Sequence, residues 1–167
     1  GVSRMMTLTN DLALTVNDLG QYQEAALLLQ RSDTIALDAG MGEAEHAMSL
    51  ANLAGVLENA GDYEGSLTAL RQAIDLLDKV EMDADHQSRR RITRSLARTL
   101  GLAGQDDKAW PLMQELRERC LRIEGQDSGE YAMLTWQLAL PAAPTATRTP
   151  APGPAPPAAR PPPPPPP

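Results

Sequence analysis

The sequence predicts an all-α fold, in which about three helical hairpins and one further helix stack side by side. The dipeptide Leu-Ala recurs at intervals of 41, 43 and 42 residues, starting at Leu12, Leu53, Leu96 and Leu138. Glycines keep nearly the same interval at Gly20, Gly61 and Gly104. A period of about 20–50 residues is typical of stacked repeat units, which usually serve as binding scaffolds rather than enzymes.

Composition confines the folded part to about the first 140 residues. Of the 15 prolines, 14 lie at or beyond Pro141, and the 167-residue chain ends in seven consecutive prolines. We therefore expect a helical-repeat domain over 1–140 and a disordered, Pro- and Ala-rich tail over 141–167. Phe is absent, so the core is expected to consist of Leu, Ala, Val, Ile and Met, which suits packed helices better than sheets.

The second unit shows how each element follows from local spacing. Apolar residues from Leu50 to Leu57 recur at i, i+3, i+4 and i+7, the pattern of one buried helical face. Gly61 suits the end of this helix, and Asp62 is a good N-cap for a second amphipathic helix that continues to about Val80. The same spacing elsewhere predicts units at about 5–40, 43–80 and 86–123, with a half unit at 128–140 that caps the stack.

Small residues stand where the two helices of each hairpin are expected to cross. The pairs are Ala13 with Ala25, Ala54 with Ser66, and Ala97 with Ala109. Because small side chains let helix axes approach closely, a larger side chain there would force the pair apart. We expect Ala54→Leu to cost about 1–3 kcal/mol of stability.

The turns of the first two units resemble the G-x-Y-x-x-A core of tetratricopeptide repeats. The matching residues are Gly20, Tyr22 and Ala25 in the first unit, and Gly61, Tyr63 and Ser66 in the second. The ordinary repeat has about 34 residues; the longer period here, with the segment Ala109-Trp110-Pro111-Leu112, is similar to kinesin light chains. The resemblance covers about residues 5–140 and implies a right-handed superhelix, although Asp106 replaces the tyrosine of the third unit.

The resemblance also implies a concave groove lined by the first helix of each hairpin. Its register places four amides on that surface, Asn10, Asn17, Asn52 and Asn59. Arg91, Arg94 and Arg98 follow at i, i+3 and i+7, and Trp136 comes from the final helix, where uncovered core is an equal alternative. Three guanidinium groups on one face could bind the carboxylates of an acidic peptide. The alternative is a solvated helix face that neutralises acids such as Asp83 and Asp85.

Other kinds of site have little support in the sequence. The chain has a net charge of −7, which disfavours nucleic-acid and anionic-membrane partners. No phosphate-binding loop, nucleophile elbow, catalytic constellation or metal-ligand spacing is present, so no cofactor or metal is expected. The lone Cys120 is interpreted as a buried structural thiol, His46 and His86 as surface residues, and Tyr22 and Tyr63 as packing residues.

The sequence therefore predicts a non-enzymatic scaffold that binds a protein or peptide in the repeat groove, and the arginines favour an acidic one. Two alternatives stay open: the sensor arm of a larger signalling enzyme, and a structural module that self-assembles through its last helix. A cytoplasmic location is the default, because no segment has the apolar length of a membrane span. We expect a monomer or weak self-association, and a tail that acts as a spacer or, less favoured, as a ligand for SH3 or WW domains.

Overall fold

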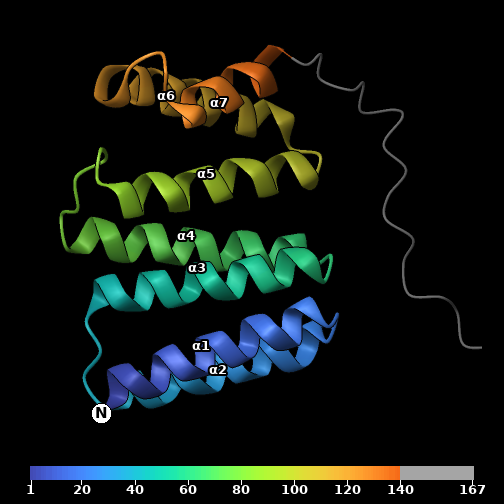
Figure 1. Ribbon diagram of the computed structural model, residues 1–167, viewed down its shortest axis with the longest axis vertical. Helices are drawn as coiled ribbons and strands as arrows, with labels where there is room; N and C mark the ends of the chain where they lie inside the picture. The colour runs from blue at the N-terminus through green and yellow to red at the C-terminus, as the bar shows by residue number, and fades with distance from the viewer. Residues whose placement is uncertain (140–167) are drawn as a thin grey trace, which may run out of the picture.

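The computed structural model describes residues 1–139, which form seven helices and no strand. Three hairpins and one further helix follow one another along the long axis of the molecule (Figure 1). The helices are α1 (Val2–Asp18), α2 (Tyr22–Asp38), α3 (Glu43–Asn59), α4 (Tyr63–Lys79), α5 (Gln87–Leu102), α6 (Asp106–Glu124) and α7 (Gly129–Ala139). The all-α repeat fold is thus confirmed, whereas the predicted tail over 141–167 lies outside the described residues.

The three periodic glycines end the first helix of each hairpin in the same way. Gly20, Gly61 and Gly104 have φ between 78° and 80°, a left-handed conformation that glycine adopts without a steric penalty. In each turn, the amide of the residue after the glycine donates to a carbonyl five residues earlier, as in the bond from Asp62 to Leu57 of 2.9 Å. This cap satisfies the carbonyls at the helix end and reverses the chain toward the second helix.

Asp62 caps the next helix, as the sequence predicts. Its Oδ1 atom accepts a hydrogen bond of 2.9 Å from the amide of Gly65. The first turn of a helix has amides without intrahelical partners, and the carboxylate accepts a hydrogen bond from one of them. Its negative charge also interacts favourably with the positive end of the helix dipole. The turn at 59–63 therefore closes one helix and starts the next within a few residues.

The small residues predicted at the helix crossings are all buried: Ala13, Ala25, Ala54, Ser66, Ala97 and Ala109. A larger central cluster joins α3, α4 and α5, and a second cluster joins α1 and α2 to α3. Leu12 departs from the predicted buried face, with 51% of its surface exposed. Its counterpart Leu53 packs on the preceding hairpin, whereas no described helix precedes α1 to cover Leu12.

The odd-numbered helices form one layer in the first part of the stack. The backbone of α1 contacts that of α3, and α3 contacts α5, in addition to the contacts between consecutive helices. The backbone of α7, by contrast, comes close to α6 alone among the described helices. Contact between α5 and α7 is therefore made by side chains and not by closely packed backbones.

Candidate peptide-binding groove

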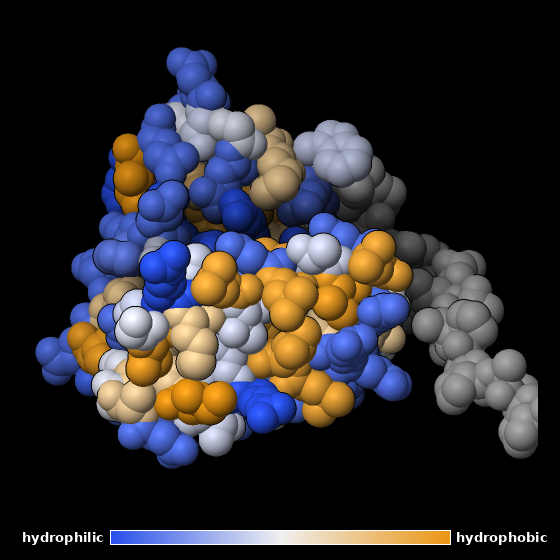
Figure 2. All heavy atoms as spheres, turned by 60° about the horizontal axis from the view of Figure 1, so that its bottom comes forward, coloured by the Kyte–Doolittle hydropathy of each residue, from blue (hydrophilic) through white to orange (hydrophobic). Residues whose placement is uncertain are grey.

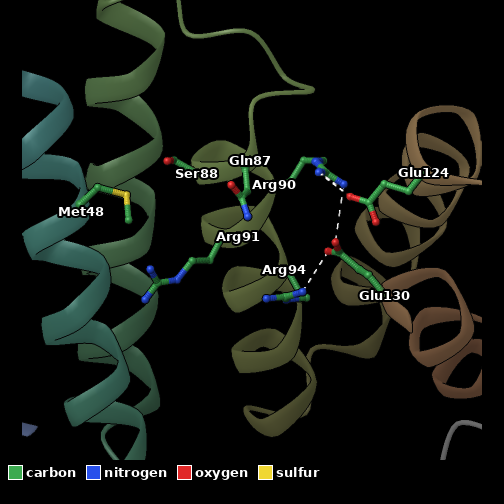
Figure 3. A pocket seen from close by; sticks show the side chains of 8 residues that line it. All are labelled: Met48, Gln87, Ser88, Arg90, Arg91, Arg94, Glu124 and Glu130. Atoms are coloured by element: carbon green, nitrogen blue, oxygen red, sulfur yellow. Dashed lines mark hydrogen bonds and ion pairs between the residues drawn. The ribbon is translucent and has the colours of Figure 1, made fainter. Parts of the chain in front are cut away.

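A pocket of about 310 Å³ lies where α3, α5, α6 and α7 meet. Met48 of α3 lines one side, and α5 contributes most of the remaining wall (Figure 3). The lining residues are Met48, Gln87, Ser88, Arg90, Arg91, Arg94, Glu124 and Glu130. Its position on the odd-numbered layer and its arginines make it the candidate site.

The arginines of α5 point in two directions (Figure 3). Arg90 and Arg94 extend toward Glu124 and Glu130, whereas Arg91 extends toward the side of α3 that carries Met48. Arg91 and Arg94 lie on neighbouring positions of one helical face, but their long side chains extend to opposite sides of it. The predicted single arginine face is thus divided between two junctions.

Arg90 is the centre of the junction with α6 and α7. Its Nη2 atom lies 2.7 Å from Glu124 Oε1, and its Nη1 atom lies 3.5 Å from both Glu130 Oε2 and Cys120 Sγ. Only 7% of Arg90 is exposed, and its Nε atom has no hydrogen-bond partner. The ion pairs offset much of the cost of burying this charge.

Sequence reasoning missed Arg90, although the repeat register contains a signal for it. Arg90 occupies the position that Ala47 occupies one unit earlier, since the matched glycines are 43 residues apart. Ala47 is fully buried in the core. An arginine at a core position of a repeat predicts a buried, paired cation, because an unpaired one would be too costly.

Two of the three predicted groove arginines are neutralised by carboxylates of the chain itself. Arg94 Nη1 lies 3.0 Å from Glu130 Oε1, and Arg98 Nε lies 3.1 Å from Glu58 Oε1. The Glu58 carboxylate also accepts a hydrogen bond of 2.6 Å from the hydroxyl of Thr99. These two guanidinium groups therefore serve first to join α5 to its neighbours.

Arg91 differs from Arg94 and Arg98 because its charge is not neutralised. It is exposed, and it forms no ion pair with any residue among 1–139. The lining residues of the pocket hold three arginines against two glutamates, so one positive charge is left over. The geometry assigns that charge to Arg91, beside the amide of Gln87 and the hydroxyl of Ser88.

The predicted amides do not form a continuous donor row. Asn59 Nδ2 donates a hydrogen bond of 3.0 Å to Asn17 Oδ1, so these two side chains partly satisfy each other where α1 and α3 end. Asn10 and Asn52 are half-buried in the middle of the same helices. Trp136 is 65% exposed on α7. The polar contacts thus concentrate around α5 rather than spreading evenly along the layer.

Ion pairing and burial shift the pKa values of Glu124 and Cys120 at the α5–α7 junction. The hydroxyl of Ser128 and the guanidinium of Arg90 hold the pKa of Glu124 below its ordinary value. Burial raises the pKa of the Cys120 thiol, and the nearby charge of Glu130 adds to this effect. The thiol therefore stays protonated at neutral pH, which supports its interpretation as a structural residue.

Asp85, which lies shortly before the arginine helix in the sequence, is neutralised by α6. Asp85 pairs with Arg119 at 2.7 Å and with Arg122 at 3.1 Å, both on α6, and these groups lower the pKa of its carboxyl. The expected pairing of α5 with Asp85 is therefore wrong. The α5 helix does neutralise other acids of the chain, among them Asp78, Glu58 and Glu130.

Both histidines have structural contacts. His46 Nε2 lies 3.0 Å from Asp33 Oδ2, which joins α3 to α2, and His86 Nδ1 accepts a hydrogen bond from the amide of Ser88 at the start of α5. Among residues 1–139, no group of three or more His, Cys, Asp or Glu side chains is placed to hold a metal. Within the same range, every helix is too short or too polar to span a bilayer.

Comparison with known proteins identifies the repeat. Residues 46–80 match the tetratricopeptide repeat, so α3 and α4 form such a repeat almost in full. The sequence matches no curated protein. Similarity to solved structures extends over most of the chain and defines its fold.

Two solved structures illustrate this similarity. The first is described as putative kinesin light chain nearly identical TPR-like repeats from Podosopora anserina. The identity is 22%, the TM-score is 0.74, and the match covers 83% of this chain and 65% of that one. The second, BtubC from P. vanneervenii, is 16% identical with a TM-score of 0.72, over 82% of this chain and 54% of that one. The present chain thus spans between about half and two thirds of their lengths.

Proposed function

We propose that this chain, which contains a tetratricopeptide repeat and has the fold of long-repeat proteins, is a non-catalytic scaffold that binds an acidic peptide. The peptide lies on the odd-numbered helices, with one carboxylate at Arg91. The observation that carries this proposal is the unneutralised guanidinium of Arg91 in a pocket whose other two arginines are already paired.

The surroundings of Arg91 favour a carboxylate on a flexible chain. A planar guanidinium binds carboxylate with two parallel hydrogen bonds, and Gln87 and Ser88 add neutral donors in the same pocket. Met48 offers an adaptable apolar contact on the α3 side. A peptide with an acidic residue next to an apolar one fits this combination better than a free inorganic anion does.

Preorganisation supports binding at this position. Arg90 and Arg94 fix α5 against α6 and α7 through ion pairs, and Ile92 and Leu96 anchor its other side in the core. The backbone that presents Arg91 is therefore already ordered before a ligand arrives. Binding then requires ordering of the peptide alone, which lowers its entropic cost.

Fluorescence anisotropy tests the proposal with a labelled Glu-rich peptide and its Gln counterpart. We expect the Glu peptide to bind, and Arg91→Ala to weaken it by about tenfold or more, since a hydrogen-bonded charge pair contributes about 1.5–3 kcal/mol. The matched control is Arg71→Ala, which removes an exposed charge from α4, a second helix of a hairpin. Equal losses in the two variants, or equal binding of the two peptides, would contradict the proposal.

A further inference from the structure

The N-terminal end of the stack exposes an apolar face on α1. Leu8 is 62% exposed and Leu12 is 51% exposed, while α3 has no large hydrophobic residue with comparable exposure. Figure 2 shows apolar side chains gathered over the end of the molecule that carries α1 and α2. A hollow of about 360 Å³ on this face is lined by Gly1, Arg4, Met5, Leu8, Thr9 and Leu12. An exposed apolar area of this kind marks an interaction surface.

The same face is buried in the inner hairpins. The counterparts of Leu8, set by the glycine register, are Ser49 and Ile92, which are both buried. Leu53, which corresponds to Leu12, packs on the preceding hairpin. The α1 face is thus a stacking surface of the same type, and none of the described residues covers it.

The α1 face differs in charge from the same face of α3 and α5. At the inner junctions, a basic residue meets an acid of the preceding helix: His46 meets Asp33, and Arg89 meets Asp78. The corresponding residue in α1 is Met5, which has no charge to offer such an acid. Tyr131 holds the same register position in α7, which packs on α6 without this ion pair, so the two ion pairs are a feature of two junctions and not a requirement for stacking.

The α1 face is complementary to itself. Arg4 and Asp11 are both exposed, and neither forms an ion pair with a described residue. They lie seven residues apart, which is two turns and about 10.5 Å along the helix, on the same side as Leu8. If a second α1 lies antiparallel, Arg4 of each copy stands level with Asp11 of the other.

We propose that two copies of this chain associate through their α1 helices, which cross antiparallel at a two-fold axis near Leu8. A two-fold interface uses the same patch on both copies and closes after two subunits, so it buries the apolar face without open-ended growth. Leu8 meets Leu8 near the axis, Leu12 packs toward the other end of the partner helix, and two Arg4–Asp11 pairs flank the contact.

Cysteine cross-linking tests the position of the axis. Leu8→Cys is expected to give a disulfide-linked dimer under mild oxidation, because the two side chains meet at the axis. The control is Leu27→Cys on α2, which is 66% exposed but lies off the proposed contact. The native Cys120 is buried and does not compete. Absence of a Leu8→Cys dimer, or equal cross-linking of Leu27→Cys, would overturn the proposal.

Analytical ultracentrifugation of the full chain tests the charge pairing. The wild type is expected to form a dimer. Leu8→Glu should be a monomer with an unchanged circular dichroism spectrum, and Arg4→Glu should raise the dissociation constant of the dimer by about tenfold or more. Combining Arg4→Glu with Asp11→Arg should restore association, because the pairs reform with reversed signs. The two-fold contact would be contradicted if the wild type stays monomeric or if the double variant does not restore association. It would also be contradicted if the wild type forms a growing series of oligomers that is lost when Trp136 of α7 is replaced.

Discussion

The two sides of α5 meet their neighbours by different means. Toward α3 and α4, the side chains Ile92, Leu96 and Leu100 enter a large apolar cluster. The small cluster around Leu134 joins α6 to α7 and contains no α5 residue, so α5 reaches this end of the stack through the ion pairs of Arg90 and Arg94. Ion pairs also occur on the first side, from Arg98 to Glu58 and from Arg89 to Asp78, but Arg91 has no ion-pair partner among residues 1–139. The guanidinium groups that join α5 to its neighbours are not free for a ligand.

Among single substitutions in α5, Arg90→Ala should cause the largest loss of stability. Removing this buried cation leaves Glu124 without its cation and Glu130 with Arg94 alone, and breaking a buried ion pair costs about 3 kcal/mol. The loss should be confined to the α5–α7 junction. Hydrogen exchange should therefore show α7 and the end of α6 losing protection, while α3 and α4 keep theirs.

Arg91→Ala provides the matched control for Arg90→Ala. It removes the same side chain one position along α5, where no ion pair is lost, and should leave exchange unchanged. If both variants open α7 equally, or if Arg90→Ala opens the whole chain at once, the junction is not held by the ion pairs.

Ala54→Leu probes the apolar side and should have the next largest effect. Ala54 is almost fully buried in the central cluster, so three added carbon atoms overpack it and cost about 1–3 kcal/mol. Chemical denaturation monitored by circular dichroism measures this loss. Gly55→Ala is the control on the same helix: no atom lies within 4 Å of an added Cβ, so the variant should be more stable by about 0.5–1 kcal/mol. Similar losses in both variants would refute tight packing at Ala54.

Acid should open the ionic junction before the apolar one. The pKa of Glu124 is lowered in the folded chain, so the unfolded chain binds more protons in the window between the two pKa values. The stability that Glu124 contributes is therefore present above its ordinary pKa and is lost as the pH falls through the lower, folded value. Salt should weaken the junction in the same direction.

The tryptophans make this acid response measurable. Trp110 and Trp136 lie in α6 and α7, so fluorescence reports the ionic end of the stack, whereas circular dichroism reports all helices. The fluorescence change should come at higher pH than the loss of helicity, and Glu124→Gln should reduce the separation. Coincident transitions in the wild type would argue against an independent junction.

The fold could be predicted because its determinants are local and repeated. The left-handed glycine at Gly61, the cap at Asp62 and the small residue at Ala54 each act within one hairpin, and the period shows that the hairpin recurs. Leu12 was predicted wrongly, since its burial depends on a neighbouring unit rather than on its own helix.

The candidate site was harder to predict, because its contacts join residues far apart in the sequence. Arg94 and Glu130 are 36 residues apart, and Arg98 and Glu58 are 40 apart. The spacing of the arginines predicts a shared face but contains no information on which carboxylates reach them. The charge that remains at Arg91 follows only after these pairings are known.

NMR of the arginine side chains can directly distinguish the structural arginines of α5, Arg90 and Arg94, from the proposed ligand-binding residue Arg91. Titration of the ¹⁵N-labelled protein with the Glu-rich peptide should shift the Nε–H resonance of Arg91, while those of Arg90 and Arg94 stay in place. A shift at Arg94 that accompanies release of Glu130, with Arg91 unaffected, would show that the ligand competes for the structural pairs and would contradict the account.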